Sequence, residues 1–431
     1  MVIFTKTVHS ITRQFILEPN TLHVTNSAEE DMLHSYRNRI HTYEMNLTNG
    51  KNWEYYKKIV NPYELVYTQK KYEYFPDSIC CLRPLSRSYF KMVEILDLIQ
   101  FFDMQYVPAM AYGGANGGAN GGANGGANGG ANQGLRTAHV CEGPGGFIEA
   151  LFDESAKRKK KINVSVAMTL RSRQSNIPGW KRASQFLQKN KNIRVIFGED
   201  HTGDIMKAIN QQYFIDYAIH PDYGGKMDIF TADGGFDFSY DYTKQEQMIF
   251  PLLVASTKIG FEVVKIGGTF ILKLFDFYQK STMDLLYLLS YHFQEWTIYK
   301  PGMSRPCNPE HYFIGKGFIG CSDEVLDSIR LWCCILENNQ PLDSLFHTAY
   351  PPEFSSIIHR LREESFKSQT EYLERVFYMI DKNDDELIKS YLKRNEKTSY
   401  EWCVRFNVPI YSQRRRLVEA SHSDLPASSP R

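Results

Sequence analysis

Two features of the sequence together could support chemistry: four separated charged residues and a glycine-rich turn. Glycines in such a turn let a nucleotide-like ligand approach the backbone and the start of the following helix. Two lysines and two carboxylates suit the activation of a weak nucleophile, such as a ribose hydroxyl, beside a methyl donor held by the turn. The charged residues are Lys91, Asp233, Lys273 and Glu310, and the turn consists of Glu142, Gly143, Pro144, Gly145, Gly146 and Phe147.

Lys273 gives the clearest functional signal of the four charged residues. It interrupts the apolar run 269–275, which predicts a strand. A lysine in such a strand either extends its ammonium group to water or has a functional role. Burial and a second lysine nearby both lower the pKa of a lysine, which suits a general base, whereas two carboxylates raise it. The sequence therefore leaves the net direction of the Lys273 pKa open.

Each of the other three charged residues, taken alone, has a structural alternative. Asp233 follows the predicted strand 227–232, where an aspartate often only caps a loop, and Lys91 and Glu310 resemble ordinary surface charges. Ligands of open α/β sheets bind at the carboxyl ends of strands, which is where Asp233 stands. The functional interpretation therefore depends on the set and not on any single member.

The turn at 142–147 fits a site for S-adenosylmethionine better than a dinucleotide site. The dinucleotide pattern G-x-G-x-x-G fails because residue 148 is isoleucine. No acidic residue closes the next predicted strand, which ends in Met168 and Thr169. The remaining alternative is a strand-to-helix turn that binds no ligand.

The segments that would position these residues alternate between strand and helix patterns. This alternation predicts a Rossmann-like, doubly wound α/β sheet with parallel strands. A helix should begin near Ser86 or Ser88, either of which is able to cap it, and Gly267 and Gly268 should follow a long amphipathic helix. The predicted strands are 138–141, 162–168, 193–197, 227–232, 269–275, 295–299 and 311–314, and the predicted helices of this region are 145–156, 245–264 and 283–291.

The sequence pattern changes on both sides of the α/β region. Residues 1–80 have no clear period and are interpreted as an N-terminal extension. We assign the α/β domain to 81–323, a helical region to 324–419 and a disordered tail to 420–431. Five copies of Gly-Gly-Ala-Asn at 113–132 contain no apolar residue larger than alanine, so this segment is predicted to be a flexible, disordered loop.

Composition restricts how the chain would contact RNA. The formal net charge is +1 over 431 residues, so contacts to nucleic acid would come from local patches and not from a global basic field. The basic runs 157–161 and 414–416 are either solvated charges or contacts to an RNA backbone. Aromatic residues make up 14% of the chain, which suits an ordinary core, and the tyrosines near position 60 have base or cap stacking as an alternative role.

The cysteines and the hydropathy of the chain predict its compartment. The eight cysteines include no C-x-x-C pair, which disfavours a zinc site and favours free thiols in a reducing compartment. Residues 1–20 contain no apolar run typical of a signal sequence, and no apolar stretch is long enough to predict a membrane span. We therefore expect a soluble, cytoplasmic protein without a metal and without a membrane partner.

Residues from about 85 to 320 resemble the FtsJ-like ribose 2′-O-methyltransferases, and most of all the subgroup that acts on capped mRNA. The resemblance is carried by the order of seven segments and by the intervals of 40 and 37 residues that separate Asp233, Lys273 and Glu310. The segments are 88–91, 141–147, 167–170, 203–205, 232–236, 270–275 and 304–312.

The resemblance implies a reaction and a role for each residue. S-adenosylmethionine would donate the methyl group, the capped 5′ end of mRNA would accept it, and other capping enzymes would be candidate partners. Lys273 would remove the proton of the 2′-hydroxyl, Asp233 would orient this lysine, and Lys91 and Glu310 would complete the site. The donor site would be formed by Glu142, Gly143, Pro144, Gly145, Gly146, Phe147, Asp204 and Asp233.

Two alternatives remain open from the sequence. A non-catalytic RNA-binding or scaffold subunit could keep the fold, although the complete charged set disfavours it. The same chemistry could instead modify ribosomal or transfer RNA. The chain also departs from the family at two places: Met168 and Thr169 stand where bacterial members have a ribose-binding acid, and 113–132 has no family counterpart.

Overall fold

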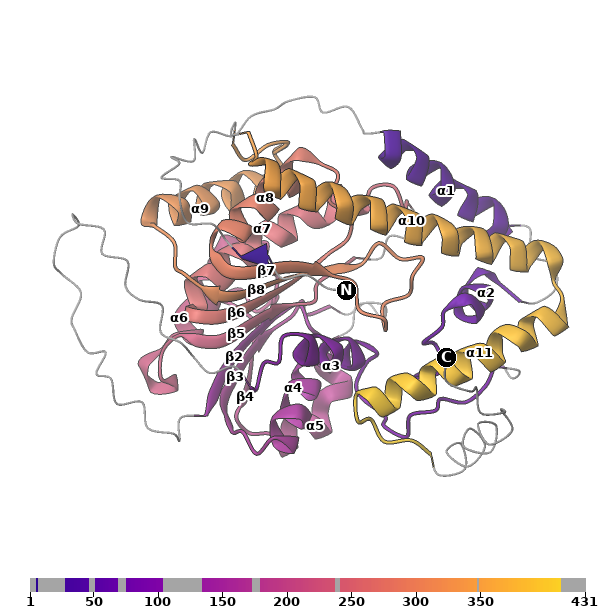
Figure 1. Cartoon of the computed structure of the whole chain (residues 1–431). Helices are drawn as coiled ribbons and strands as arrows, with labels where there is room; N and C mark the ends of the chain where they lie inside the picture. Colours follow the sequence, from indigo (N-terminus) through magenta and orange to yellow (C-terminus); the bar gives the residue numbers. More distant parts are fainter. Residues whose placement is uncertain are drawn as a thin grey trace, which may run out of the picture.

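Figure 1 shows the computed structural model of the chain. The structure describes residues 5–6, 28–45, 51–68, 75–103, 134–172, 179–236, 241–346 and 349–411. The repeat at 113–132, the arginines 414–416 and the tail at 420–431 lie outside these residues. Among the described helices, none is both long and apolar enough to span a bilayer.

Eight strands form one sheet at the centre of the described structure. They are β1 (Thr5–Lys6), β2 (Leu135–Val140), β3 (Ile162–Met168), β4 (Ile193–Ile196), β5 (Met227–Ala232), β6 (Val264–Leu274), β7 (Phe293–Tyr299) and β8 (His311–Phe318). Their order across the sheet is β1-β7-β8-β6-β5-β2-β3-β4. The strands from β2 to β6 are mutually parallel, whereas β8 is antiparallel to both β6 and β7.

The parallel sheet predicted from the sequence therefore holds for β2 to β6 and not for the last strands. The connection 300–310 between β7 and β8 is too short for a helical crossover, which takes about a dozen residues or more. β8 consequently returns in the opposite direction, next to β6. This reversal places the beginning of β8 at the same edge of the sheet as the carboxyl ends of β5 and β6.

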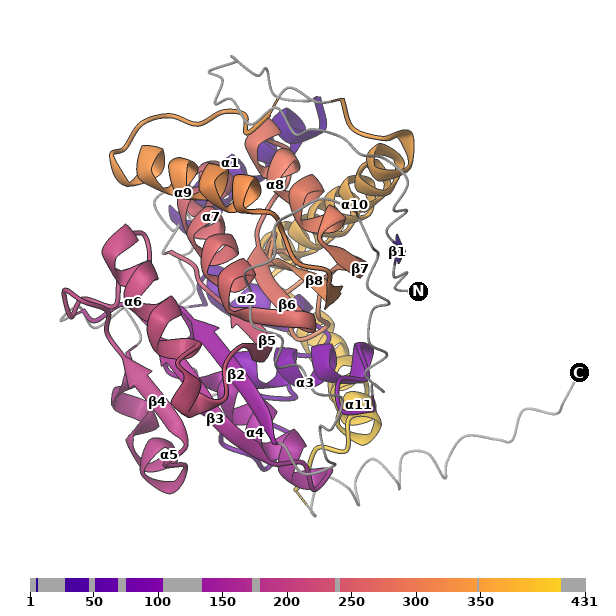
Figure 2. The same cartoon turned by 90° about the vertical axis from the view of Figure 1, so that its left-hand side faces the viewer.

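Helices cover both faces of the sheet, so the doubly wound architecture is confirmed (Figures 1 and 2). One face shares an apolar core with α6 (Ala208–Ala218), α7 (Gln245–Val263), α8 (Lys280–Tyr291) and α9 (Asp323–Glu337). The other face is covered by α3 (Ser88–Leu98), α4 (Gly146–Lys157) and α5 (Ser184–Lys189).

Two predicted helix ends are wrong. α7 ends at Val263, and Gly267 and Gly268 lie within β6 instead of following the helix as a cap. α3 has Arg87 at its N-cap position and no side-chain cap, because the hydroxyls of Ser86 and Ser88 lie 2.6 Å from each other and are hydrogen-bonded together. α7 is also buried almost all round and not amphipathic, since α6 and α9 pack against its outer side.

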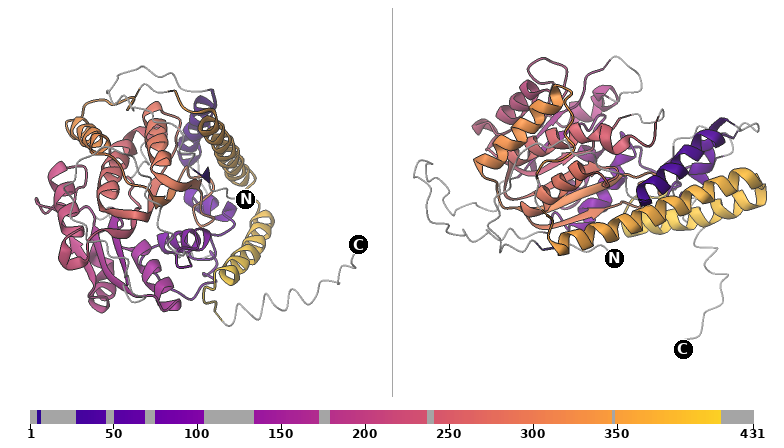
Figure 3. Two further views of the ribbon diagram at one scale, coloured as in Figure 1. Left: turned by 60° about the vertical axis from the view of Figure 1, so that its left-hand side comes forward. Right: turned by 90° about the horizontal axis from the view of Figure 1, so that it is seen from above.

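Two long helices form a hairpin beyond the sheet (Figure 3). They are α10 (Pro352–Lys382) and α11 (Asp385–Arg405). A helix-like period runs through 355–392 in the sequence, but Asn383 adopts a left-handed φ of 43° and Asp384 caps the second helix with its side chain. The helical character of the C-terminal region is therefore confirmed, with a break inside the predicted stretch.

The N-terminal extension contains two helices that the sequence analysis missed. α1 (Ala28–Met45) lies along α10, and α2 (Trp53–Val60) contacts both α10 and α11 (Figure 1). Only widely spaced positions of α1, such as Leu33 and Ile40, are buried apolar residues, so its pattern is weak without the partner helix. Arg37 joins α1 to the sheet through an ion pair with Asp276 at 2.6 Å.

Candidate active site

The four predicted charged residues converge into two adjacent ion pairs, which we call the tetrad. Lys91 Nζ on α3 lies 2.6 Å from Glu310 Oε1, just before β8. Lys273 Nζ on β6 lies 3.3 Å from Asp233 Oδ1, just after β5, and donates a hydrogen bond to the Asp233 carbonyl at 2.9 Å. The structure thus brings together residues that lie far apart in the sequence: Lys91 and Glu310 are separated by 219 positions.

The sheet topology explains this convergence. β5 and β6 are parallel neighbours in which Ala232 pairs with Leu272, so Asp233 and Lys273 follow at the same carboxyl edge. β8 runs the other way and pairs its first residue, His311, with Leu274. Glu310 therefore reaches the same edge from the opposite direction, and the N-terminal half of α3 supplies Lys91 from above it.

Tyr312 is a site residue that the sequence analysis missed. Its hydroxyl donates to Asp233 Oδ1 at 2.7 Å and lies 3.3 Å from Glu310 Oε1, so it bridges the two ion pairs. The side chain is fully buried. One signal was available: Tyr312 stands two positions after Glu310 at the start of a predicted strand, and residues two apart face the same side.

The charges of the tetrad shift the pKa values of Lys273 and Glu310. Burial alone would lower the pKa of Lys273, but the Asp233 and Glu310 carboxylates outweigh it, and the pKa is raised. Burial would raise the pKa of Glu310, but Lys91 and Lys273 outweigh it, and the pKa lies well below its usual range. The direction of the Lys273 pKa, which the sequence leaves open, is therefore upward, and this favours the charged ammonium in the free site.

The glycine-rich turn connects β2 to α4 beside the tetrad. Gly145 has a φ of 106°, which a residue with a side chain rarely adopts. A Cβ on Gly146 would lie 2.2 Å from Ser86 Oγ, so only glycine allows this close approach to the start of α3. The Gly143–Pro144 peptide bond is cis. The two glycines thus let the turn approach the segment that begins α3 closely.

The side chains of three residues predicted for the donor site make contacts within the protein. The buried Glu142 carboxylate accepts a hydrogen bond from Thr231 and lies 3.3 Å from His139 Nδ1, and burial raises its pKa. Phe147 is buried beneath the turn, with its ring 5.7 Å from that of Tyr312. Asp204 Oδ1 accepts from the backbone amide of Met206 at 3.0 Å.

A pocket of about 670 Å³ opens between the turn and the tetrad. This volume is in the range of a nucleotide-sized ligand. Gly143, Pro144 and Asp233 line it on one side, so the residues present fit a nucleotide-like methyl donor. The other lining residues are Glu54, Lys58, Glu64, Tyr67, Leu85, Ser86, Arg87, Ser88, Cys141, Arg182, Gly235, Phe236, Lys273, Phe275, Arg305 and Glu310.

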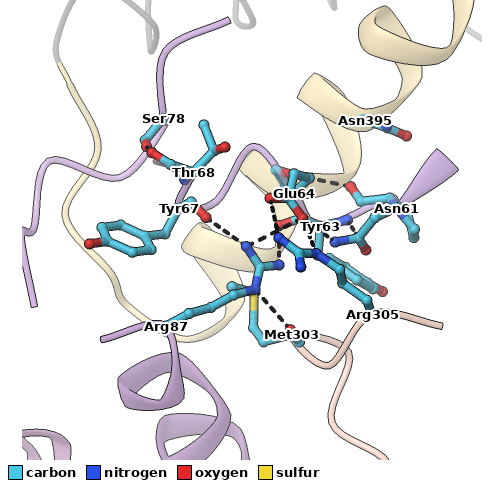
Figure 4. A network of polar contacts seen from close by, with 12 residues as sticks. Asn61, Tyr63, Glu64, Tyr67, Thr68, Ser78, Arg87, Met303, Arg305 and Asn395 are labelled. Carbon is cyan, nitrogen blue, oxygen red and sulfur yellow. Dashed lines mark hydrogen bonds and ion pairs between the residues drawn. The ribbon is translucent and has the colours of Figure 1, made fainter. Parts of the chain in front are cut away.

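A second group of charges, with a buried carboxylate at its centre, also lines the pocket (Figure 4). We call Glu64, Arg87 and Arg305 the wall cluster. Arg305 donates through Nε and Nη2 to Glu64 at 3.1 Å each, and Arg87 Nη1 lies 3.6 Å from the same carboxylate. Burial opposes ionisation of Glu64, but the two guanidiniums outweigh it and lower its pKa to about 2. The sequence analysis did not identify this cluster.

Comparisons with known proteins agree with this geometry. Residues 84–318 match a family model described as FtsJ-like methyltransferase. A Dictyostelium discoideum protein named cap-specific mRNA (nucleoside-2′-O-)-methyltransferase 1 is 31% identical over 212 residues, which are 47% of this chain and 28% of the relative. A Trypanosoma cruzi protein of the same name is 33% identical over 184 residues, which are 42% of this chain and 48% of the relative.

A viral protein matches over a longer region. A probable methyltransferase of African swine fever virus is 26% identical over 298 residues, which are 64% of this chain and 67% of the relative. The sequence of the whole chain also predicts a resemblance to this viral protein, and the match confirms it over 64% of the chain. The chain spans less than half the length of the Dictyostelium and Trypanosoma relatives. Residues 51–68, which line part of the pocket, precede the part of the chain that matches the family model.

Proposed function

Because the chain belongs to the FtsJ-like methyltransferase family, we propose that it transfers a methyl group from S-adenosylmethionine to a ribose 2′-hydroxyl of RNA. The substrate we propose is the first transcribed nucleotide of capped mRNA, in line with the names of the similar Dictyostelium and Trypanosoma proteins. The main support is one observation: both ion pairs of the tetrad adjoin a single pocket with the glycine-rich turn.

Lys273 acts as the general base in this proposal. It accepts the proton of the 2′-hydroxyl, and the oxygen then attacks in line, so most of the rate comes from positioning the two reactants. S-adenosylmethionine supplies the methyl group on a positively charged sulfonium, and such a charge beside Lys273 favours the neutral amine that a base requires. In the free site the two carboxylates hold the proton on Lys273.

The other residues of the site orient this base and the ribose. Asp233 fixes the ammonium of Lys273 through its carbonyl and its carboxylate, and Tyr312 in turn holds that carboxylate. The pair of Lys91 and Glu310 stands on the opposite side of Tyr312 and positions the ribose. Gly143 and Pro144 form the part of the pocket where the donor binds.

A methyl-transfer assay with short RNAs tests the proposal. The parent protein should methylate a capped oligonucleotide on its first ribose, and Lys273→Met should lower the rate by at least about 100-fold. Lys316→Met is the matched control, because Lys316 is also a strand lysine paired with a carboxylate, Glu295 at 2.9 Å, but does not line the pocket. Its rate should equal that of the parent.

Three outcomes would overturn parts of the proposal. Equal rates for the parent and Lys273→Met would remove the role of the base. Equal transfer to capped and uncapped RNA would exclude the mRNA assignment and favour ribosomal or transfer RNA. Binding of RNA without any transfer would favour the non-catalytic subunit.

A further inference from the structure

A second hollow, which we call the groove, adjoins the pocket beside α4 and α5. Its volume is about 670 Å³, and Leu85 and Arg182 line both the groove and the pocket, so the two meet at these residues. α4 and α5 lie side by side and form its sides (Figures 1 and 2). We propose that the groove binds the RNA strand downstream of the methylated nucleotide. This inference rests on the proposed function and names the path of the substrate beyond the pocket.

The two helices give the groove an aromatic surface. Glu149, Phe152, Asp153 and Ala156 recur at intervals of three and four along α4, so they stand on one face of the helix, and this face lines the groove. The Phe152 ring meets the ring of Phe186 on α5 edge-on, with 5.8 Å between their centres. Both side chains are half-buried. Aromatic rings in a charged groove suit a single strand, because bases stack on the rings while phosphates contact cations.

Three cations of the groove are available to a ligand. Lys160, Arg182 and Lys189 line the groove, and all three are exposed. Within the ranges that the structure describes, no carboxylate lies within ion-pair distance of their side chains. A phosphate that contacts them therefore displaces no ion pair between described residues.

The structure also divides the basic run 157–161, for which the sequence leaves solvated charges and RNA contacts open. Lys157 Nζ lies 2.7 Å from Glu154, and Arg158 pairs with the same carboxylate, so these two charges are compensated on α4. Lys160 faces the groove instead. The run thus contributes one groove cation and is not an RNA contact as a whole.

The carboxylates of the groove do not cancel its positive charge. Glu149 Oε2 accepts a hydrogen bond from the amide of Leu85 at 2.7 Å, and burial raises the pKa of Glu149 to about 7, so its charge is only partial at neutral pH. Asp153 accepts from the hydroxyl of Tyr89 at 3.0 Å. Arg83 is the fourth basic residue of the groove. Four cations therefore face at most two carboxylates, and 4 − 2 leaves an excess of at least two positive charges.

The continuity with the pocket favours RNA over an acidic protein as the occupant. The tetrad residues Asp233, Lys273 and Glu310 line the pocket in which the ribose would react, and Arg182 lines this pocket as well as the groove. A strand that leaves the pocket past Arg182 therefore enters the groove. The chain carries a formal net charge of only +1, so the positive excess is a local feature of this path.

Equilibrium binding of two capped RNAs tests the groove, one a dinucleotide and the other about 12 nucleotides long. The double variant Lys160→Met with Lys189→Met removes two cations that line the groove and not the pocket. The slope of log K against log salt for the longer RNA should become shallower by about 1.4, and its Kd should rise about tenfold at about 0.15 M salt, as expected for two phosphate contacts. The Kd of the dinucleotide should stay that of the parent.

The double variant Lys159→Met with Lys191→Met is the matched control. Both lysines are exposed, stand one and two positions from the residues they control, and do not line the groove. The loss of charge is the same, but both RNAs should bind as they do to the parent. If the first double variant does not show the parent's thermal unfolding midpoint, Lys160→Gln with Lys189→Gln replaces it with the same expected slope.

Three outcomes would overturn the groove. They are an unchanged Kd for the longer RNA, an equal loss of binding for the dinucleotide, and an equal loss of binding in the control. Unchanged RNA binding together with weaker binding of polyglutamate would favour an acidic protein as the occupant.

The binding assay separates this inference from the proposed function, because it requires no methyl transfer. A parent protein that binds the longer RNA through Lys160 and Lys189 but transfers no methyl group would contradict the proposed function and support the groove. A parent protein that methylates capped RNA, with the same Kd for the longer RNA in both double variants, would do the reverse.

Discussion

The tetrad and the wall cluster adjoin the same pocket, yet their charges are satisfied in different ways. In the wall cluster, Arg87 binds three backbone carbonyls besides Glu64, and Asn61 donates to the same carboxylate at 2.7 Å. In the tetrad, the ammonium of Lys273 has three N–H donors. Among the described residues, its hydrogen-bond contacts are to Asp233 only. The wall cluster, whose donors are used by backbone carbonyls and by Glu64, therefore stabilises the fold. The tetrad, which keeps unused N–H donors beside the pocket, suits chemistry.

Lys273→Arg gives the largest expected effect and tests the tetrad side of the comparison. Arginine keeps the positive charge beside Asp233 and Glu310 but does not lose its proton in the accessible pH range. Methyl transfer should fall by about 10²- to 10⁴-fold, while the urea midpoint of unfolding stays near that of the parent. An active Lys273→Arg protein would mean that this position supplies charge and not a base.

Glu64→Gln tests the other side, and its effect should appear mainly in stability. The substitution leaves the half-buried guanidiniums of Arg87 and Arg305 without their shared carboxylate, which costs about 3 kcal/mol of unfolding free energy. Urea denaturation measures this loss. A Glu64→Gln protein with the parent's midpoint and a strongly reduced rate would reverse the roles assigned to the two clusters.

Lowering the pH tests the same comparison, because it protonates Glu64. The folded-state pKa of this buried carboxyl is about 2, below the ordinary value of 4.5, because two guanidiniums outweigh burial. Its contribution, about 3 kcal/mol, is therefore complete above pH 4.5 and is lost as the pH falls towards 2. Unfolding free energies measured from pH 5 to 2.5 should fall less steeply in Glu64→Gln, and parallel curves would contradict this assignment.

Trp402→Phe should have a smaller effect than either of these changes, and it tests how far the hairpin supports the pocket. Trp402 Nε1 donates to Glu94 at 3.0 Å, and Glu94 accepts from the amides of Gly302 and Met303 in the loop that carries Arg305. Losing one donor should cost about 1 kcal/mol of unfolding free energy.

A matched surface change supplies the reference for that small effect. Arg39→Met removes the exposed pair between α1 and Glu374 on α10, which should cost less than about 1 kcal/mol. A larger loss in Arg39→Met than in Trp402→Phe would mean that exposed pairs, and not the buried link to Glu94, fix the hairpin.

The sequence was sufficient where one segment carries its own signal. β3 and β5 begin and end as predicted, because apolar runs bounded by polar residues define strands that are buried on both faces. The convergence of the tetrad could also be predicted from the order of its motifs. Its catalytic roles and the domain limits after residues 80 and 323 stay predictions.

The sequence did not predict features that depend on contacts between distant segments. Glu64 and Arg305 are 241 positions apart, and nothing in either local pattern indicates their pairing. The helices α1 and α2 both pack against α10, which lies far along the chain, and the apolar positions of α1 are sparse. The direction of the Lys273 pKa was open for a similar reason, since it depends on how close the two carboxylates lie once the sheet has formed.

The contact of α2 with α11 has a consequence for biosynthesis. A ribosome releases segment 51–68 long before the residues Asn395 and Ser399 that anchor it. The nascent sheet can assemble first, but its pocket stays one-sided until translation has passed position 399. Under the proposed function, incomplete chains would therefore lack a complete site for methyl transfer.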